Sequence, residues 1–433
     1  MGKLISTLTA FVFVFFIYLN ANAQTANTYL FSTSTGGVLN PMTGSTNLIA
    51  PGAPLGDDGP SALTTFPGAP AFVFPYEALT YTQFTVTPDG FCKLGSPVGV
   101  AQNTNVITNT TNRPKVFPLW DNLAIGTLAG GGKVHYLMTG SFPNRIFIIE
   151  WYVTIPRNIS GPANSRFQLW LYENGRIAFV YGTLGIAPSS SVGINSIVAN
   201  PSNFESVTIS SHTMSTTIEN NTNSISPASG RIYTFTPTLS LLAYLPGQGC
   251  PEDITVEFRN FTNPNTNLIA PQVVSLPVSG AAKVSIGNIA YNNNAYIVIK
   301  HPNSLETWSK LAQPITAGMT YSFRSSVTQA FCDNQRLFSG VPAIHRGDFN
   351  QDGIIDVEDV NQLENDINNF VTGNAITDLD CSGFVDFSDL FTMSLDYYPI
   401  IVSNPSFLIF PQAYVNRPPD PSLAYPNYCD VEP

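Results

Sequence analysis

Two twelve-residue segments near the C-terminus place oxygen-bearing side chains at a spacing that suits a hard cation. They span residues 348–359 and 378–389, and the second begins thirty residues after the first. Each has an oxygen-bearing side chain at positions 1, 3, 5, 9 and 12, and each has glycine at position 6, where a calcium-binding loop turns sharply. In such a loop position 7 contributes its backbone carbonyl, and position 9 often acts through water.

A short amphipathic helix is expected after each loop. Apolar residues recur at helical spacing of three and four: Val360, Leu363, Ile367 and Phe370 after the first loop, and Leu390, Met393 and Tyr397 after the second. A shift of thirty residues superimposes the two sets, so the segment is an internal repeat. Little before the first loop is suited to an entering helix, and position 12 is Asp where ordinary EF-hands have Glu.

This pair of loop–helix units resembles the dockerin module over about residues 347–398. The resemblance implies a small helical module at 345–400 that binds two calcium ions. The implied ligands are Asp348, Asn350, Asp352, Ile354 (carbonyl), Asp356 and Asp359 in the first loop, and Asp378, Asp380, Ser382, Phe384 (carbonyl), Asp386 and Asp389 in the second.

Dockerins bind cohesin-type receptors, often through loop positions 10 and 11. Here these positions hold Val357 and Glu358 in the first loop, and Phe387 and Ser388 in the second. They differ from the Ser-Thr pair of cellulosomal type I dockerins. The implied partner is therefore a cohesin-like protein or another surface protein.

The negative charge of the chain is concentrated in the same segment. Residues 346–396 contain 12 of the 29 acidic residues and 1 of the 18 basic residues, which leaves 17 of each sign elsewhere. Clustered carboxylates repel one another, and a divalent ion offsets that repulsion. We expect the module to be largely unfolded without calcium. The balanced charge elsewhere gives no basis for nucleic-acid binding.

The N-terminal residues 1–23 have the pattern of a secretory signal peptide, with Lys3, an apolar run and a small-residue cleavage site. That run is too short to span a membrane, and no later stretch is long and apolar enough. We expect a secreted or cell-surface protein without a transmembrane segment.

The five cysteines are Cys92, Cys250, Cys332, Cys381 and Cys429, too few for a disulfide scaffold in a chain of this length. Cys250 and Cys332 bracket one expected domain and are the first choice for a bridge. Free buried thiols are the alternative.

The fold class expected for the body is mainly β, with two β-sandwich domains ahead of the helical module. In residues 24–240 the segments 145–153, 167–172 and 176–181 are apolar strand patterns, and Asn174-Gly175 between the last two is a strong hairpin signal. Residues 241–344 contain strand candidates that suit an immunoglobulin-like sandwich: 254–259, 272–276, 282–286, 295–300 and 320–325.

Residues 81–90, 118–122 and 167–182 resemble the N-terminal β-sandwich of secreted multidomain proteins from Bacteroidota, and the last two stretches also resemble nidogen-type extracellular domains. Residues 300–309 resemble a stretch that precedes a dockerin-like repeat in such proteins. Many of these relatives end in a sorting domain for type IX secretion. Residues 401–433 form instead a short, proline-rich C-terminal tail.

No enzymatic motif stands out. The four histidines, at 135, 212, 301 and 345, lack zinc-binding spacing, and there is no Gly-x-Ser-x-Gly or Walker sequence. A glycosidase needs two carboxylates at one cleft. The candidates are Asp57, Asp58, Glu77, Asp121, Glu150 and Glu173, for which turn caps and cross-strand partners are the plainer interpretation.

The sequence therefore predicts a non-enzymatic, calcium-binding protein of the cell surface or exterior. Calcium either orders helices for protein docking or adhesion, or stiffens a structural scaffold. If it serves docking, the helix-face residues Gln362, Asp366, Thr392 and Asp396 should be exposed. The alternative is a carbohydrate-binding or polysaccharide-degrading component anchored by its dockerin. Its sugar platform would come from these aromatic residues: Trp120, Trp151, Tyr152, Trp170, Tyr172 and Trp308.

Overall fold

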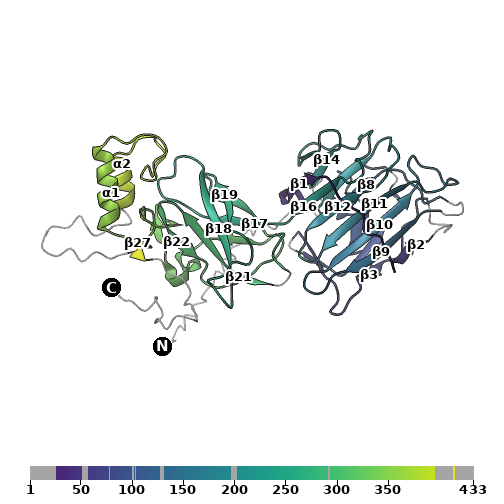
Figure 1. The fold of residues 1–433 in the computed structure, drawn as a ribbon, viewed down its shortest axis with the longest axis horizontal. Coiled ribbons are helices and arrows are strands. Elements are labelled where there is room, and N and C mark those ends of the chain that lie inside the picture. Colours follow the sequence, from purple (N-terminus) through teal and green to yellow (C-terminus); the bar gives the residue numbers. More distant parts are fainter. Residues whose placement is uncertain are drawn as a thin grey trace, which may run out of the picture.

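Three parts follow one another along the long axis of the molecule (Figure 1). The computed structural model describes residues 26–50, 57–77, 79–99, 102, 104–126, 131–196, 202–290, 293–394 and 413–414. Over these residues the protein is mainly β, as predicted, with two α-helices near the C-terminal end. The predicted signal peptide, and the predicted tail except for residues 413–414, lie outside the described residues.

The N-terminal part is a sandwich of two antiparallel sheets. One sheet has the order β1 (Leu30–Ser34), β16 (Ile232–Thr236), β12 (Ile177–Tyr181), β11 (Ser165–Tyr172), β10 (Ile146–Val153), β9 (Lys133–Thr139) and β2 (Thr46–Ile49). The other has the order β15 (Thr213–Ser215), β14 (Phe204–Thr208), β13 (Ser191–Asn195), β8 (Lys115–Trp120), β7 (Cys92–Leu94), β6 (Gln83–Val86) and β3 (Thr64–Thr65). A short hairpin joins β4 (Phe74–Tyr76) to β5 (Leu79–Tyr81).

Alternating side chains on facing strands form the core of this sandwich. Trp151 of β10 stacks on Phe167 of β11 with ring centroids 5.4 Å apart, and both rings are buried. The predicted Asn174-Gly175 hairpin joins β11 to β12, and Gly175 has a φ of 90°, a conformation that favours glycine. The core as a whole runs from Ala26 to Phe235.

The second part has its own core, from Leu239 to Ile344. One sheet has the order β20 (Ala281–Ser285), β17 (Thr238–Leu242) and β24 (Thr320–Ser322). The other has the order β19 (Gln272–Leu276), β18 (Glu252–Asn260), β21 (Asn294–His301) and β22 (Ser304–Trp308), with β23 (Gln313–Pro314) also paired to β21. Each of the five predicted strand segments overlaps an observed strand, whereas β22 was not anticipated. A further hairpin, β25 (Arg336–Phe338) to β26 (Val341–Ala343), precedes the loops.

The third part, here called the loop module (residues 345–394), contains α1 (Val357–Asn368) and α2 (Phe387–Ser394). Its core includes Leu363 of α1 and Met393 of α2, and Leu305 of the second part packs in the same cluster. The loop module therefore shares its core with the second part. One expectation was wrong: Phe370 lies beyond the end of α1 with a φ of 55° and is exposed, outside the apolar stripe.

Candidate metal centre

Position 12 of the first loop organises the turn. Asp359 Oδ1 accepts hydrogen bonds from the backbone N–H groups of Phe349 (2.7 Å) and Asn350 (3.3 Å), and its Oδ2 accepts from Asp356 N–H (3.0 Å). Asp356 in turn caps α1 by accepting from Glu358 N–H at 2.8 Å. Both acidic residues thus fix the loop against the start of the helix.

The second loop repeats this network thirty residues later. Asp389 Oδ1 accepts from the N–H groups of Leu379 (2.6 Å) and Asp380 (3.3 Å), and its Oδ2 accepts from Asp386 N–H at 2.9 Å. Asp386 accepts from Ser388 N–H at 2.7 Å, in the same capping position. The sequence repeat is therefore also a repeat of conformation.

Position 1 of the first loop carries a buried oxygen that lacks a donor. Asp348 Oδ2 accepts from Gly353 N–H at 3.2 Å, but Oδ1 has no hydrogen-bond partner among the described residues, although the side chain is only 2% exposed. An unpaired buried carboxylate oxygen is costly unless a cation or another donor reaches it. The residues present thus fit a bound cation.

The first loop contains crowded, buried carboxyl groups whose pKa values are raised. Burial, followed by the charges of Asp359 and Asp352, raises the pKa of Asp348 to about 7. Burial also raises the pKa of Asp359. The loop without an ion therefore holds carboxylates where negative charge is disfavoured.

Three acidic side chains of the second loop converge. Asp378, Asp380 and Asp389 offer carboxylate oxygens that all lie within 4.8 Å of one another. Burial raises the pKa of Asp378 and of Asp389. Burial also acts on Asp380, but hydrogen bonds, led by that from the Ser388 hydroxyl, lower its pKa. Oxygen donors at this separation suit a hard cation.

Position 5 differs between the loops. In the first loop Asn350 Oδ1 accepts from Asp352 N–H at 3.0 Å, and in the second Asp380 Oδ1 accepts from Ser382 N–H at 2.9 Å. The Ser382 hydroxyl donates to the carbonyl of Phe384 at 3.0 Å, so two of the expected ligands are bonded to each other. Each loop supplies four carboxylates, but the second has a hydroxyl at position 5 and a carboxylate at position 3, where the first has a carboxylate and an amide.

The position 7 segments pair with different partners. β27 (Ile354–Ile355) pairs with β28 (Ala413–Tyr414), whereas Phe384 forms an isolated bridge with Thr372. The two loops are therefore not joined to each other through these segments.

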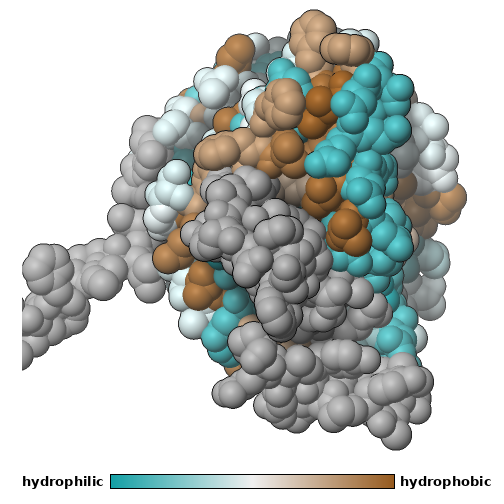
Figure 2. Space-filling model, turned by 90° about the vertical axis from the view of Figure 1, so that its left-hand side faces the viewer, coloured by the Kyte–Doolittle hydropathy of each residue, from teal (hydrophilic) through white to brown (hydrophobic). Residues whose placement is uncertain are grey.

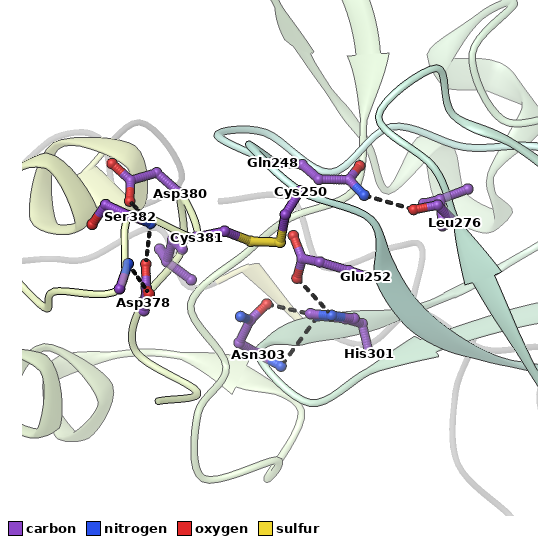
Figure 3. Close-up of a disulfide and its surroundings, with 12 residues drawn as sticks. Gln248, Cys250, Glu252, Leu276, His301, Asn303, Asp378, Asp380, Cys381 and Ser382 are labelled. Atoms are coloured by element: carbon purple, nitrogen blue, oxygen red, sulfur yellow. Dashed lines mark hydrogen bonds and ion pairs between the residues drawn. A yellow bond between two sulfur atoms is a disulfide. The ribbon is translucent and has the colours of Figure 1, made fainter. Parts of the chain in front are cut away.

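Sequence reasoning missed a buried contact between the loop module and the second part. Cys250 forms a disulfide with Cys381, which is position 4 of the second loop, so the predicted Cys250–Cys332 bridge was wrong. Cys332 is itself disulfide-bonded, and Cys92 is a buried free thiol. The prediction failed because Cys250 and Cys381 are 131 residues apart and only the folded chain brings them together. Figure 3 shows this disulfide with Asp378, Asp380 and Ser382 of the loop on one side and Glu252, His301 and Asn303 on the other.

Arg346 is the second element of that contact. Its guanidinium, fully buried, donates to both carboxylate oxygens of Glu252 (3.1 and 3.0 Å) and to the carbonyl of Leu379, position 2 of the second loop (2.7 Å). Although burial opposes it, hydrogen bonds from His301 and Arg346 hold the pKa of Glu252 below its usual value. A buried arginine shared in this way joins the two parts.

The helices have one covered face and one exposed face. Thr392 was predicted to be exposed but is buried, because α2 lies against Gly247 of the second part. Gln362 and Asp366 are partly buried, and Asp366 accepts from the Thr377 hydroxyl at 2.7 Å. Asp396 lies outside the described residues.

The exposed face contains positions 10 and 11 of both loops. The side chain of Phe387 is 75% exposed, and Val357, Glu358 and Ser388 are also exposed. Hydrophobic and hydrophilic surfaces lie side by side on the end of the molecule that carries the loop module (Figure 2). Over the described residues, this face is therefore exposed to solvent.

The candidate catalytic carboxylates have structural partners. Glu150 is buried and contacts His135 Nε2 (2.9 Å), Arg166 Nη1 (3.2 Å) and Gln168 Nε2 (2.7 Å). The other partners are Arg157 for Asp57, Ala26 N–H for Glu77, Ser189 for Asp121 and Arg145 for Glu173. Among the described residues, these contacts do not bring two of the candidate carboxylates together at one cleft. Asp58 Oδ1 is buried without a partner among the described residues, in a segment bordering residues outside them.

Hydrogen bonds run from Ser45 to His135 (2.6 Å to Nδ1) and on to Glu150, the order in which a nucleophile, a base and a carboxylate stand in a hydrolase. His135 and Glu150 are nevertheless buried, and Glu150 is already shared with Arg166 and Gln168. The simpler interpretation is that these hydrogen-bonded residues hold the segment before β2 against the sheet.

Half of the candidate sugar-stacking aromatics are buried. Trp120, Trp151 and Trp308 are buried, whereas Tyr152, Trp170 and Tyr172 are partly exposed on the outer face of β10 and β11. The Arg166 guanidinium lies 4.0 Å from the ring centroid of Tyr152, beside a cavity of about 610 Å³. Its lining residues include Leu39, Tyr152, Arg166, Thr183 and Ser229.

Comparison with known proteins gives a family match for the N-terminal sandwich. Residues 28–237 match the model of a family described as NIDO related, which agrees with the resemblance of this region to nidogen-type domains. That family is not one of enzymes. No curated protein and no solved structure matched the chain. Among the described residues, none of the helices combines the length and apolar character needed to cross a membrane.

Proposed function

We propose that this is a non-enzymatic, extracellular calcium-binding protein in which two ions order the loop module against the second part. The observation that carries the proposal is the repeated loop network together with the unpartnered, buried Oδ1 of Asp348. A calcium ion in each loop would take its oxygens from the side chains at positions 1, 3, 5 and 12, with the carbonyl at position 7. The ion would offset the burial and the charge repulsion that together raise the carboxyl pKa values.

A structural role for calcium is favoured over a purely docking role. The loop module shares a core residue, Leu305, with the second part and is bonded to it through Arg346. Ordering the loops therefore stabilises a contact within the chain. Docking through the exposed positions 10 and 11 is compatible with this arrangement, because those positions lie away from the contact at Thr392.

Calcium titration of the full chain by calorimetry tests the proposal. We expect two ions per chain, and one ion each for the Asp348→Ala and Asp378→Ala variants, because each loses the position 1 ligand of one loop. Glu364→Gln, the same loss of charge at an exposed residue of α1 outside the loops, should still bind two. A wild-type chain that binds no calcium at millimolar concentration would contradict the proposal.

The cavity beside Tyr152 supports a second candidate function, the binding of an acidic sugar. Among the described residues that line it, Arg166 is the only charged one, and the Tyr152 ring and the Thr183 and Ser229 hydroxyls offer contacts that a sugar uses. A glycan array probed with the full chain should give signals for uronic or sialic acids that Arg166→Ala abolishes and Arg157→Ala retains. Silence on every acidic glycan would count against it.

A further inference from the structure

The second loop lies directly against residues of the second part of the chain. The turn before β18 brings Gly247 and Gly249 against α2 and the loop: a Cβ on Gly249 would lie 2.3 Å from the carbonyl oxygen of Asp380. Only glycine allows this approach without a shift of the backbone. Asp380 is position 3 of the loop, so Gly249 contacts a residue that is itself an expected calcium ligand.

Two further bonds hold positions 2 and 4 of the second loop in place. The Cys250–Cys381 disulfide holds position 4, and the hydrogen bond from Arg346 to the carbonyl of Leu379 (2.7 Å) holds position 2. The N–H of Leu379 donates to Asp389, the position 12 ligand, at 2.6 Å. Positions 2, 3 and 4 are thus all restrained by residues outside the loop.

Arg346 is restrained in its turn by the second part. Both oxygens of Glu252 accept from its guanidinium, His301 contacts Glu252 at 2.9 Å, and Asn303 Oδ1 accepts from Arg346 Nε at 3.1 Å. Asn303 Nδ2 also donates to the carbonyl of Ile376, two residues before the loop (3.0 Å). The network is buried, so its geometry is held without competition from water.

Among the described residues, positions 2 to 4 of the first loop have no disulfide or short hydrogen bond to the second part, although β27 at position 7 pairs with β28. Gln351, position 4 of the first loop, donates to the carbonyl of Asp348 within the loop and makes only a long contact (3.5 Å) to Ser304. The first loop also has the fuller set of carboxylate and amide side chains, because position 5 is Asp352 rather than Ser382. The loop with serine at position 5 is the one whose positions 2 and 4 are bonded to residues outside it.

We infer that the second calcium site is a composite of two domains, in which Cys250–Cys381 and the Glu252–Arg346 pair act as positioning residues for the loop. This inference rests on the proposed calcium function. Residues that orient metal ligands through a further bond typically change metal affinity by about 10–100-fold when removed. Loss of these positioning residues should therefore weaken the second site selectively.

The test follows each loop separately in the intact chain labelled with ¹⁵N-glycine. The amides of Gly353 and Gly383 donate to the position 1 carboxylates of the first and second loop, so each reports on its own site during a calcium titration. The Asp348→Ala and Asp378→Ala variants assign the two signals. Near-ultraviolet circular dichroism checks that each variant retains its fold.

In Cys250→Ser/Cys381→Ser, we expect the Gly383 transition to move to at least about tenfold higher calcium, with the Gly353 transition within about twofold of wild type. Glu252→Gln, which keeps the disulfide, should shift Gly383 in the same direction. Unchanged transitions in both variants, or equal shifts of both glycines, would overturn the inference. If neither glycine responds in the wild-type chain, the proposed calcium function fails instead.

Discussion

At the scale of single residues, the loops are built from carboxylates that serve two tasks. Asp359 and Asp389 bind backbone N–H groups and so shape the turn, while Asp348 and Asp378 stand at position 1 with raised pKa values. The difference in position 5 distinguishes the two loops. It makes the first loop the one from which the stronger calcium binding is expected.

The raised pKa of Asp348 predicts a pH dependence with a defined sign. In the calcium-free fold this carboxyl keeps its proton up to about pH 7, whereas an unfolded chain releases it near pH ~4. Protonation thus stabilises the calcium-free fold at low pH, and this contribution is lost as the pH rises through the folded pKa. Calcium must displace the proton, so its affinity should rise with pH in the same window.

The measurement is the calcium affinity of the Asp378→Ala variant, in which the first loop alone binds, at several pH values. We expect affinity to fall by up to about tenfold for each pH unit below the pKa, as one proton competes with the ion. An affinity that is flat between about pH 5.5 and 7.5 would show that Asp348 is ionised without calcium and would contradict the assigned pKa.

At the scale of elements, each loop is followed by a helix whose buried face completes a small shared core. Leu363 of α1 is fully buried there with Met393 of α2 and Leu305 of β22. A helix as short as α1 or α2 gains most of its stability from such packing rather than from its own propensity. Core packing and calcium binding should therefore stabilise the same unit.

Truncation of Leu363 tests that core. Leu363→Ala should lower the free energy of unfolding of the calcium-bound loop module by about 2–5 kcal/mol, because it removes buried methyl groups and leaves a cavity. Val357→Ala, on the exposed face of the same helix, should change it by no more than about 0.5 kcal/mol. Denaturant unfolding at saturating calcium measures both, and equal effects would show that Leu363 is not in the core.

The elements that the sequence predicted well are those whose signal is local. The loop–helix repeat, the β11–β12 hairpin and five strands of the second part each follow from spacing within a few residues. The restraints on the second loop do not, since Arg346 and Glu252 are 94 residues apart in the chain. Thr392 was assigned to an exposed face for the same reason: helical spacing separates faces but does not say which face meets a neighbouring domain.

At the scale of the whole molecule, the N-terminal sandwich has a separate core and few bonds to the rest. Asn174 donates to the carbonyl of Gly287 at 2.6 Å, and Thr238 donates to the carbonyl of Thr28 at 3.0 Å. The second part and the loop module instead share a core, an ion pair and a disulfide. Calcium should consequently affect the C-terminal two parts and leave the N-terminal sandwich unchanged.

Amide hydrogen exchange of the full chain, with calcium and with chelator, measures whether calcium orders the loop module. We expect chelator to remove protection from residues 347–394 and to weaken it in the strands next to Cys250, while residues 28–237 exchange as before. Slow exchange of the loop module that is the same in calcium and in chelator would contradict the claim that calcium orders it.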